Sequence, residues 1–345
     1  MVADKVDIRA LELAQLQDWV KEAGEPAFRA KQIYKWIWEN GATDINEMTN
    51  LSKGLREKMQ NHFCIQAITT DEVQYSKDGT IKSRFQLHDS HMIEGVLIPA
   101  DGRKTACVSS QVGCSLSCKF CATGKMKRLR NLTAAEIVDQ VRIINQQSKK
   151  KYDAHLSNIV FMGMGEPLLN YRQVKLAIDT MCDPNMWNMS PSRFTVSTAG
   201  IAKMIHQLAE DEVRFNLALS LHAANDEKRN QIMEINKQNN LEVLKEALLH
   251  YNKVTDKRIY LEYIVFNKFN DSIQDADDLI RFARTFPCKI NLIEYNTVEG
   301  TGMEKSSEER LMAFQNRLHA ARITATLRRS RGKDIDAACG QLANK

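Results

Sequence analysis

Three of the chain's eight cysteines, Cys114, Cys118 and Cys121, lie within eight residues of one another. Placing eight cysteines at random in a chain of this length would give on the order of 0.004 such triplets, so the grouping is not chance. The C-x3-C-x2-C spacing puts three thiolates on one tight loop, where they can bind the same metal centre. A structural zinc usually has four protein ligands in two separate C-x2-C pairs, and the sequence holds no second pair. Three ligands suit an iron–sulfur cube with one iron left open to bind another molecule.

The elements that must position this loop are strand-like and helical runs, which alternate six times between Thr105 and Ala321. The expected strands are 106–109, 158–162, 193–197, 215–221, 259–266 and 290–295. The expected helices are 133–147, 172–182, 201–210, 241–253, 273–286 and 307–321. The first helix opens with the capping-box pattern Thr133-Ala-Ala-Glu136. Six such repeats predict an α/β fold, a parallel sheet curled into an incomplete (β/α)6 TIM-like barrel.

Small or polar residues follow five of the six expected strands. The C-terminal ends of parallel strands meet at one mouth of a barrel, so these residues are expected to lie together. One of them alone is commonly a turn or a cap, and His222 alone could be a structural histidine, but five strand ends together predict a ligand site. Gly165 would let the backbone approach a ligand, and Glu166 would supply a carboxylate to an ammonium group or to ribose hydroxyls. Besides the cysteine loop, the strand-end residues are Gly163, Gly165, Glu166, Ser197, Ser220, Leu221, His222 and Asn296.

The sequence pattern divides the chain into four parts. We expect 1–62 to form a small helical N-terminal domain, 63–100 a strand-rich connector, 101–325 the barrel and 326–345 a C-terminal segment. The expected strands of the connector are 69–74, 82–87 and 92–99, with a turn at 77–79.

The N-terminal part is expected to contain helices at 8–20 and 26–38. In the second of these, cations alternate with aromatic residues. The aromatic residues could form a packed helix face, or the cations and rings could dock RNA, and both can hold on opposite faces. The residues concerned are Arg29, Lys31, Tyr34, Lys35, Trp36 and Trp38.

Composition and charge restrict the class of protein. The chain has 345 residues, 43% hydrophobic and 26% charged, which is ordinary for a globular protein. It shows no signal peptide and no apolar run of the ~20 residues that a membrane span needs. The cysteines are not spaced as a disulfide framework, so we expect a cytoplasmic monomer with no membrane partner. A net charge of +5 permits a nucleic-acid partner.

Two basic runs lie beside the residues that could carry chemistry, where a phosphate backbone would have to pass. The alternative is that they are solvated surface charge. Three further cysteines match no motif and are expected to be small core residues. The basic residues are Lys119, Lys125, Lys127, Arg128 and Arg130 in one run and Arg328, Arg329, Arg331 and Lys333 in the other, and the remaining cysteines are Cys64, Cys182 and Cys288.

Around the cysteine loop, residues 107–124 resemble the radical S-adenosylmethionine (SAM) enzymes, and within them the RlmN/Cfr group that methylates adenine carbons in RNA. Residues 334–342, Asp-Ile-Asp-Ala-Ala-Cys-Gly-Gln-Leu, resemble the same group. The resemblance implies the partial-barrel fold and a [4Fe–4S] cluster on the three cysteines. It also implies SAM contacts at Gly165, Glu166, Ser197, Ser220, Leu221, His222 and Asn296.

The resemblance further implies that two SAM molecules are used per turnover. Cys339 takes a methyl group from the first, and the second, cleaved at the cluster, gives a radical that removes hydrogen from this S-methyl group. The carbon radical adds to the adenine and forms a covalent protein–RNA adduct. Cys107 then helps to release the product and is left in a disulfide with Cys339. Glu94 matches the family's proton acceptor, and its alternative is an exposed strand carboxylate.

The implied substrates are an adenine of 23S rRNA at the peptidyl-transferase centre and the adenine 3′ to the anticodon of tRNA, each extruded from its stack. The implied electron donor is a flavodoxin or ferredoxin. Residues 161–170 resemble the branch that methylates C2, chiefly through Pro167, whereas 182–193 resemble the branch that methylates C8 and confers antibiotic resistance. C2 methylation is the first expectation and C8 methylation the alternative. A hypothesis from another class is a non-catalytic, zinc-stabilised RNA-binding protein, in which Cys339 would have no role.

Overall fold

The computed structural model describes residues 5–344. Its centre is one sheet with the strand order β14-β13-β12-β11-β10-β9-β6-β5-β4-β3. The strands from β6 to β14 along this order pair in parallel, and β3, β4, β5 and β6 pair antiparallel. The bounds are β3 Thr69–Tyr75, β4 Ile81–Gln86, β5 Met92–Ala100, β6 Arg103–Cys107, β9 Asn158–Phe161, β10 Phe194–Thr198, β11 Asn216–Ser220, β12 Ile259–Val265, β13 Cys288–Glu294 and β14 Ala325–Arg328.

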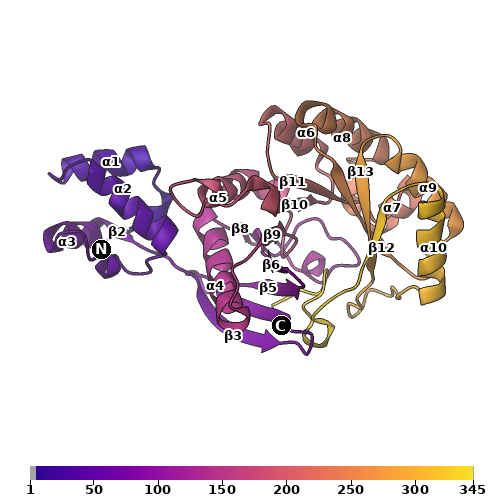
Figure 1. The fold of residues 1–345 in the computed structure, drawn as a ribbon, viewed down its shortest axis with the longest axis horizontal. Coiled ribbons are helices and arrows are strands. Elements are labelled where there is room, and N and C mark those ends of the chain that lie inside the picture. Colours follow the sequence, from indigo (N-terminus) through magenta and orange to yellow (C-terminus); the bar gives the residue numbers. More distant parts are fainter. Residues whose placement is uncertain (1–4, 345) are drawn as a thin grey trace.

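Helices connect the parallel strands and lie along the outside of the curved sheet (Figure 1). Because each strand returns through such a connection, the C-terminal ends of the parallel strands meet at one edge. The helices are α4 Ala134–Tyr152, α5 Tyr171–Cys182, α6 Ala202–Glu210, α7 Asp226–Ile232, α8 Leu241–Thr255, α9 Ile273–Ala283 and α10 Glu308–Ala320. The predicted fold class and the six strand–helix repeats are confirmed.

Two elements of the barrel were not predicted. Strand β14 has only four residues and ends in a basic run, so its sequence lacks the apolar signal of a strand. Helix α7 has seven residues, mostly polar, and follows β11 in a stretch for which no helix was predicted.

The core lies between the sheet and the helices. Strands with both faces covered are expected to be continuously apolar, and in β12 all residues except Tyr260 are buried. The capping box of α4 forms as predicted: Thr133 Oγ1 accepts the Glu136 N–H at 3.2 Å, and Glu136 Oε2 accepts the Thr133 N–H at 2.9 Å.

The N-terminal helices form a lobe at one end of the molecule (Figure 1). Trp38 is buried, and its carbonyl oxygen accepts hydrogen bonds from Trp187 Nε1 at 2.9 Å and Arg142 Nη2 at 3.1 Å. These bonds and an Arg9–Asp139 ion pair of 2.7 Å fasten the lobe to the core. The helices are α1 Leu13–Glu22, α2 Phe28–Lys35, which continues as a π-helical turn over Trp36–Asn40, and α3 Lys53–His62.

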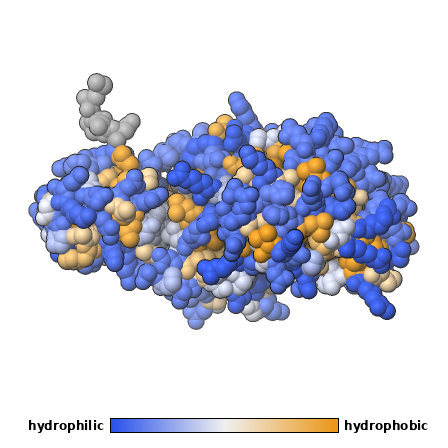
Figure 2. Space-filling model, turned by 90° about the horizontal axis from the view of Figure 1, so that it is seen from above, coloured by the Kyte–Doolittle hydropathy of each residue, from blue (hydrophilic) through white to orange (hydrophobic). Residues whose placement is uncertain are grey.

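The boundary expected at residue 100 falls in the turn between β5 and β6, and the sheet continues across it, with Val96 opposite Cys107. Two short pairs complete the strands, β1 Val6–Asp7 with β2 Phe63–Cys64, and β7 Gln111–Val112 with β8 Arg130–Asn131. None of the helices in the described part of the chain is both long and apolar enough to span a membrane. The face in Figure 2 is mostly hydrophilic, with hydrophobic residues scattered over it.

Candidate active site

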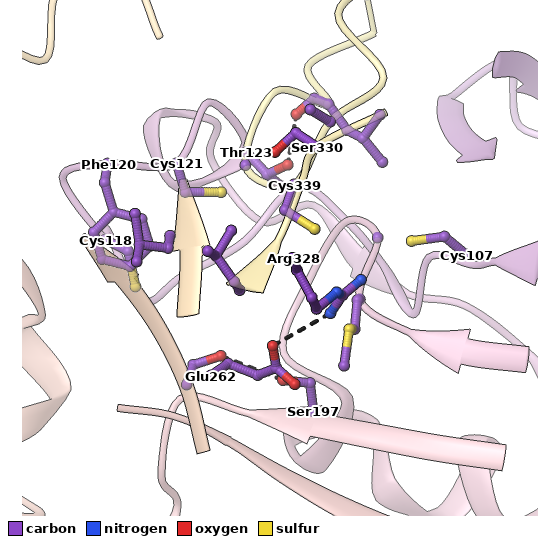
Figure 3. A pocket seen from close by; sticks show the side chains of 18 of the residues that line it. Cys107, Cys118, Phe120, Cys121, Thr123, Ser197, Glu262, Arg328, Ser330 and Cys339 are labelled. Carbon is purple, nitrogen blue, oxygen red and sulfur yellow. Dashed lines mark hydrogen bonds and ion pairs between the residues drawn. The ribbon is translucent and has the colours of Figure 1, made fainter. Parts of the chain in front are cut away.

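The C-terminal ends of the parallel strands surround a cavity of about 460 Å³ (Figure 3). Most residues that the sequence proposed for the site line this cavity. Leu221, Asn296 and Glu94 do not. The predicted residues that line the cavity are Cys107, Cys114, Cys118, Cys121, Gly163, Gly165, Glu166, Ser197, Ser220, His222 and Cys339.

The three-cysteine loop is tightly wound. The Cys121 N–H donates to the Cys118 carbonyl at 3.2 Å, and the Gly124 N–H donates to the Cys121 carbonyl at 3.1 Å. A Cβ atom on Gly124 would lie 2.6 Å from the Cys118 carbonyl oxygen, so only glycine fits at this close approach. The winding brings all three thiols to one side of the cavity.

Glu166 presents a buried carboxylate at the end of β9. Its Oε2 accepts the Ala199 N–H at 2.8 Å and its Oε1 accepts the Leu168 N–H at 3.0 Å. Burial raises the pKa of Glu166 to about 7, although these hydrogen bonds to the carboxylate act to lower it. Gly165 has φ +98°, and a Cβ there would lie 2.5 Å from the Cβ of Gln111, which explains the glycine.

Strands β10 and β11 bring two hydroxyls together, with 3.3 Å between Ser197 Oγ and Ser220 Oγ. Next to them, His222 Nδ1 accepts the Ile264 N–H at 3.1 Å, so the ring proton is on Nε2. Burial, and then the charge of Arg229, lower the pKa of His222 to about 3, which keeps the ring neutral. His222 is therefore both held by the fold and part of the cavity wall.

Leu221 and Asn296 lie just behind the wall. The Leu221 side chain is buried, and its N–H donates to the Glu262 carbonyl at 3.0 Å. Asn296 Nδ2 donates to Ser330 Oγ at 2.9 Å, and Ser330 lines the cavity. Neither the Leu221 nor the Asn296 side chain lines the cavity.

Glu94 is fully buried in β5, so the alternative of an exposed strand carboxylate is wrong. Its Oε2 accepts the N–H groups of Ala343 at 2.8 Å and of Asn344 at 3.1 Å. Lys82 Nζ lies 3.4 Å from Oε1. In this structure Glu94 holds the end of the C-terminal segment rather than facing the cavity.

The C-terminal segment crosses the cysteine loop and carries Cys339 into the cavity. The Gly340 carbonyl accepts the Ala122 N–H at 2.7 Å, and the Leu342 carbonyl accepts the Thr123 hydroxyl at 2.6 Å. Figure 3 shows the sulfur atoms of Cys339 and Cys107 pointing toward one another across the cavity. Both are free thiols, and burial followed by the proximity of Cys339 raises the pKa of Cys107 to about 12.

Known proteins are similar to this chain in sequence and in structure. Residues 6–65 match the ribosomal RNA large subunit methyltransferase N-terminal domain, and residues 108–283 match the radical SAM superfamily. A probable dual-specificity RNA methyltransferase RlmN of Cytophaga hutchinsonii is 53% identical, over 98% of this chain and 93% of that protein. A protein of the same name from Christiangramia forsetii is 50% identical, over 99% and 97%. The chain belongs to the RlmN family.

The fold agrees with this membership. The crystal structure of a radical SAM methyltransferase from Sphaerobacter thermophilus matches with a TM-score of 0.93 at 38% identity, over 99% of this chain and 100% of that one. As a member of the RlmN family the chain is a radical SAM methyltransferase whose cofactors are a [4Fe–4S] cluster and SAM. The hypothesis of a non-catalytic zinc-stabilised RNA-binding protein is set aside.

The three cysteines fit an iron–sulfur cube better than a single ion. No three His, Cys, Asp or Glu side chains in residues 5–344 are placed to hold one metal ion, as a zinc with sulfur ligands at ~2.3 Å requires. A cube binds each thiolate at a different iron, so its ligands lie farther apart than those of a single ion, and the three thiols here line one cavity. Burial raises the pKa of Cys114 to about 11 and raises those of Cys118 and Cys121 as well. The cationic iron–sulfur core would offset this cost by stabilising the thiolates.

Sequence reasoning missed the role of Arg328 and Glu262. Arg328 was assigned to an RNA-facing basic run, but its side chain enters the cavity beside Cys339 (Figure 3). Its Nη1 lies 3.3 Å from Glu262 Oε2, and Glu262 Oε1 accepts Asn291 Nδ2 at 2.7 Å. Burial lowers the pKa of Arg328, but Cys339, Glu262 and Cys107 raise it by more. The position of Arg328 at the end of a parallel strand was the missing signal, because β14 was not recognised.

Proposed function

We propose that this chain methylates C2 of an adenine in 23S rRNA and of the adenine 3′ to the anticodon in tRNA. The observation that carries the proposal is the pair of free thiols, Cys107 and Cys339, that face one another across the cavity that the three-cysteine loop also lines. Relatives of half-identical sequence are named dual-specificity RNA methyltransferases, which supports both RNA substrates.

Cys114, Cys118 and Cys121 would hold the cluster, and the strand-end residues would hold SAM. When bound, these groups supply a methyl donor and a 5′-deoxyadenosyl radical. Glu166 would receive the ammonium group or the ribose hydroxyls, and the neutral His222 would donate from Nε2. The proposed SAM-binding residues are Gly165, Glu166, Ser197, Ser220, Leu221, His222 and Asn296. Leu221 would contribute through its backbone, and Asn296 through its hydrogen bond to Ser330.

Cys339 would serve as the methyl carrier. C2 of adenine has no lone pair to attack a methyl cation equivalent, so a carbon-centred radical on the carrier is the available route. Ala338 and Gly340 flank Cys339 and leave room for a base to approach the sulfur. Addition of the carrier carbon to C2 joins protein and RNA by a covalent S–CH₂ link. The adduct must then lose the C2 proton and one electron, equal in number to the electron that cleaved SAM, which restores the aromatic ring.

Cys107 would resolve this link. Its thiolate attacks the Cys339 sulfur and breaks the S–CH₂ bond, and the released carbon takes up a proton to become the product methyl group. The two sulfurs are left as a disulfide, which two electrons from a reductant must restore. Burial holds the pKa of Cys107 near 12, and the Arg328 guanidinium acts in the opposite direction. Arg328 is thus placed to favour the thiolate that release requires.

Glu94 would act mainly by anchoring the segment that carries Cys339. A role as proton acceptor requires the segment to move away, because Oε2 accepts two N–H groups of that segment. We retain the proton-acceptor role as a proposal that depends on this movement.

The exposed cations Lys119, Lys127 and Arg128 lie beside the cysteine loop and would contact RNA phosphates. The second basic run contributes less than the sequence suggested, because Arg329 pairs with Glu308 and Lys333 pairs with Glu294 at 2.5 Å. We propose a monomer that works in the cytoplasm, where its RNA substrates are, with a flavodoxin or ferredoxin as electron donor.

The test is anaerobic reconstitution, followed by reaction with SAM and 23S rRNA and by mass spectrometry of the adenine product. 2-Methyladenine that is lost in Cys339→Ala supports the proposal. 8-Methyladenine would replace the C2 assignment by the C8 alternative. No modified adenine from a protein with its full iron content would overturn the proposed function.

A further inference from the structure

Arg229, in helix α7, is the most completely enclosed charged residue near the cavity, with no exposed surface. Its guanidinium donates to the carbonyl oxygens of Leu221 at 3.0 Å, Ala199 at 2.7 Å and Ser220 at 3.2 Å. It also donates to Asn236 Oδ1 at 2.6 Å. All four partners are neutral, and no ion pair of Arg229 is found among residues 5–344. A buried charge without a carboxylate partner is costly, so the fold retains this cation for a reason beyond packing.

The guanidinium remains charged at neutral pH. Burial lowers the pKa of Arg229 to about 10, and the opposing anionic influences are Cys118 first and Asp226 second. Asp226 is linked to Arg229 through Asn236. Its Oδ1 accepts a hydrogen bond from Asn236 Nδ2 at 2.8 Å, and Asn236 Oδ1 accepts one from Arg229. The charge of Arg229 therefore interacts with the cysteine loop and with the carboxylate of Asp226.

Helix α7 touches the cysteine loop directly. The Lys119 N–H donates to the carbonyl oxygen of Ile232, the last residue of α7, at 3.0 Å. Phe120 packs in one apolar cluster with Ile232 and Met233. The carbonyl groups that Arg229 holds belong to residues at the C-terminal ends of β10 and β11, and two of these residues, Ala199 and Ser220, line the cavity. Arg229 thus stands behind the wall that the three cysteines face.

We propose that Arg229 is the buried counter-charge of the iron–sulfur centre and raises its reduction potential. Three thiolate ligands make the assembled centre a net anion, and the electron that activates it adds one more negative charge. A fixed cation in a low-dielectric wall favours the more negative, reduced state. Its hydrogen bonds to the strand ends fix its position, so Arg229 is a positioning and electrostatic residue without ligand contact. The inference rests on the cluster ligands proposed above.

The experiment is a redox titration of the reconstituted protein, followed by electron paramagnetic resonance, with dithionite and mediators and without SAM or RNA. Arg229→Met removes the charge and keeps the length of the side chain, and Arg229→Lys keeps the charge. Asp226→Asn leaves Arg229 in place and keeps the oxygen that accepts from Asn236, but removes the opposing charge.

At a fixed potential we expect the ratio of reduced to oxidised cluster to fall at least tenfold in Arg229→Met, which is ~59 mV for a one-electron couple. In Arg229→Lys the ratio of reduced to oxidised cluster should stay within threefold of the wild-type ratio. Asp226→Asn should shift the ratio in the opposite direction, toward the reduced cluster.

An unchanged potential in an Arg229→Met protein with wild-type iron content would overturn the proposal. If that variant does not hold a full cluster, Asp226→Asn decides: a shift toward the reduced state supports the proposal, and an unchanged potential overturns it. Iron content of the wild type tests the ligand set separately. A wild-type protein that binds no iron would refute the proposed cluster ligands. A protein with a normal cluster whose reduction potential does not change in the variants would refute the proposed role of Arg229.

Discussion

Arg328 and Glu262 form an ion pair inside the cavity, with 3.3 Å between Nη1 and Oε2, and so hold a guanidinium between two free thiols. Strand β14 delivers the arginine and strand β12 the carboxylate. Arg329, the residue that follows β14, also lines the cavity, but its guanidinium pairs with Glu308 and Glu294 instead of Glu262. The two arginines therefore have different roles despite their adjacency in sequence.

Removing the Arg328 guanidinium should slow the release of product. The charge of Arg328 opposes the burial that raises the pKa of Cys107 to about 12, so Arg328→Met raises this pKa further. The thiolate fraction of Cys107 at neutral pH falls roughly tenfold for each unit of increase. We expect the covalent protein–RNA adduct to accumulate, as measured on denaturing gels, and to resolve faster as the pH is raised.

The matched control is Arg329→Met, which removes an adjacent guanidinium that pairs with Glu308. It should weaken RNA binding at most and should resolve the adduct at the wild-type rate. Equal accumulation in both variants would mean that Arg328 acts through general charge and not on Cys107.

Breaking the anchor at Glu94 should loosen the C-terminal segment. Glu94→Ala leaves Lys82 buried without its partner and frees the N–H groups of Ala343 and Asn344. We expect the free energy of unfolding to fall by about 3 kcal/mol, and hydrogen exchange at 343–344 to become fast. The double variant Lys82→Met/Glu94→Gln removes both charges and should recover most of the stability.

The same variants separate the two roles proposed for Glu94. Glu94→Gln keeps an oxygen that can accept the two N–H groups, so an anchoring role predicts slow exchange and near-normal methylation of Cys339. If exchange stays slow while RNA methylation is lost, Glu94 acts as a proton acceptor.

Much of the fold and part of the site could be predicted from the sequence, because both depend on local patterns. Alternating apolar and amphipathic runs predict the barrel, and strand ends identify Glu166 and His222 by position alone. The approach of Cys339 to Cys107 depends on contacts between distant segments, such as those of Thr123 with Leu342, which periodicity does not contain.

The environment of Glu94 was missed for a similar reason. On a strand, an isolated carboxylate is expected to face solvent, and it does so unless another segment covers it. Here residues 343 and 344 cover β5, and Asn344 Nδ2 donates to the Met92 carbonyl at 2.7 Å. A capping segment of this kind has no signature in the sequence of the strand that it covers.

Each cysteine of the three-cysteine loop should be needed for iron binding. Alanine at Cys114, Cys118 or Cys121 should abolish the iron–sulfur absorbance and lower the iron content to near zero, because a cube held by two thiolates is readily lost. Cys288→Ala is the control, since Cys288 is half-buried away from the cavity and donates to the Ala283 carbonyl at 3.3 Å. Full iron retention in any of the three loop variants would show that another group serves as ligand.

Binding of SAM should depend on pH through Glu166. Burial raises the pKa of this carboxyl to about 7, so the unliganded protein holds the proton below that pH. A cationic ammonium group prefers the carboxylate, and binding must then release the proton. The affinity for SAM, measured anaerobically by equilibrium dialysis, should therefore be roughly tenfold weaker at pH 6 than at pH 8. Glu166→Gln cannot ionise and should bind more weakly with no such slope. A wild-type affinity equal at both pH values, or an equal slope in Glu166→Gln, would assign the ammonium group to another residue.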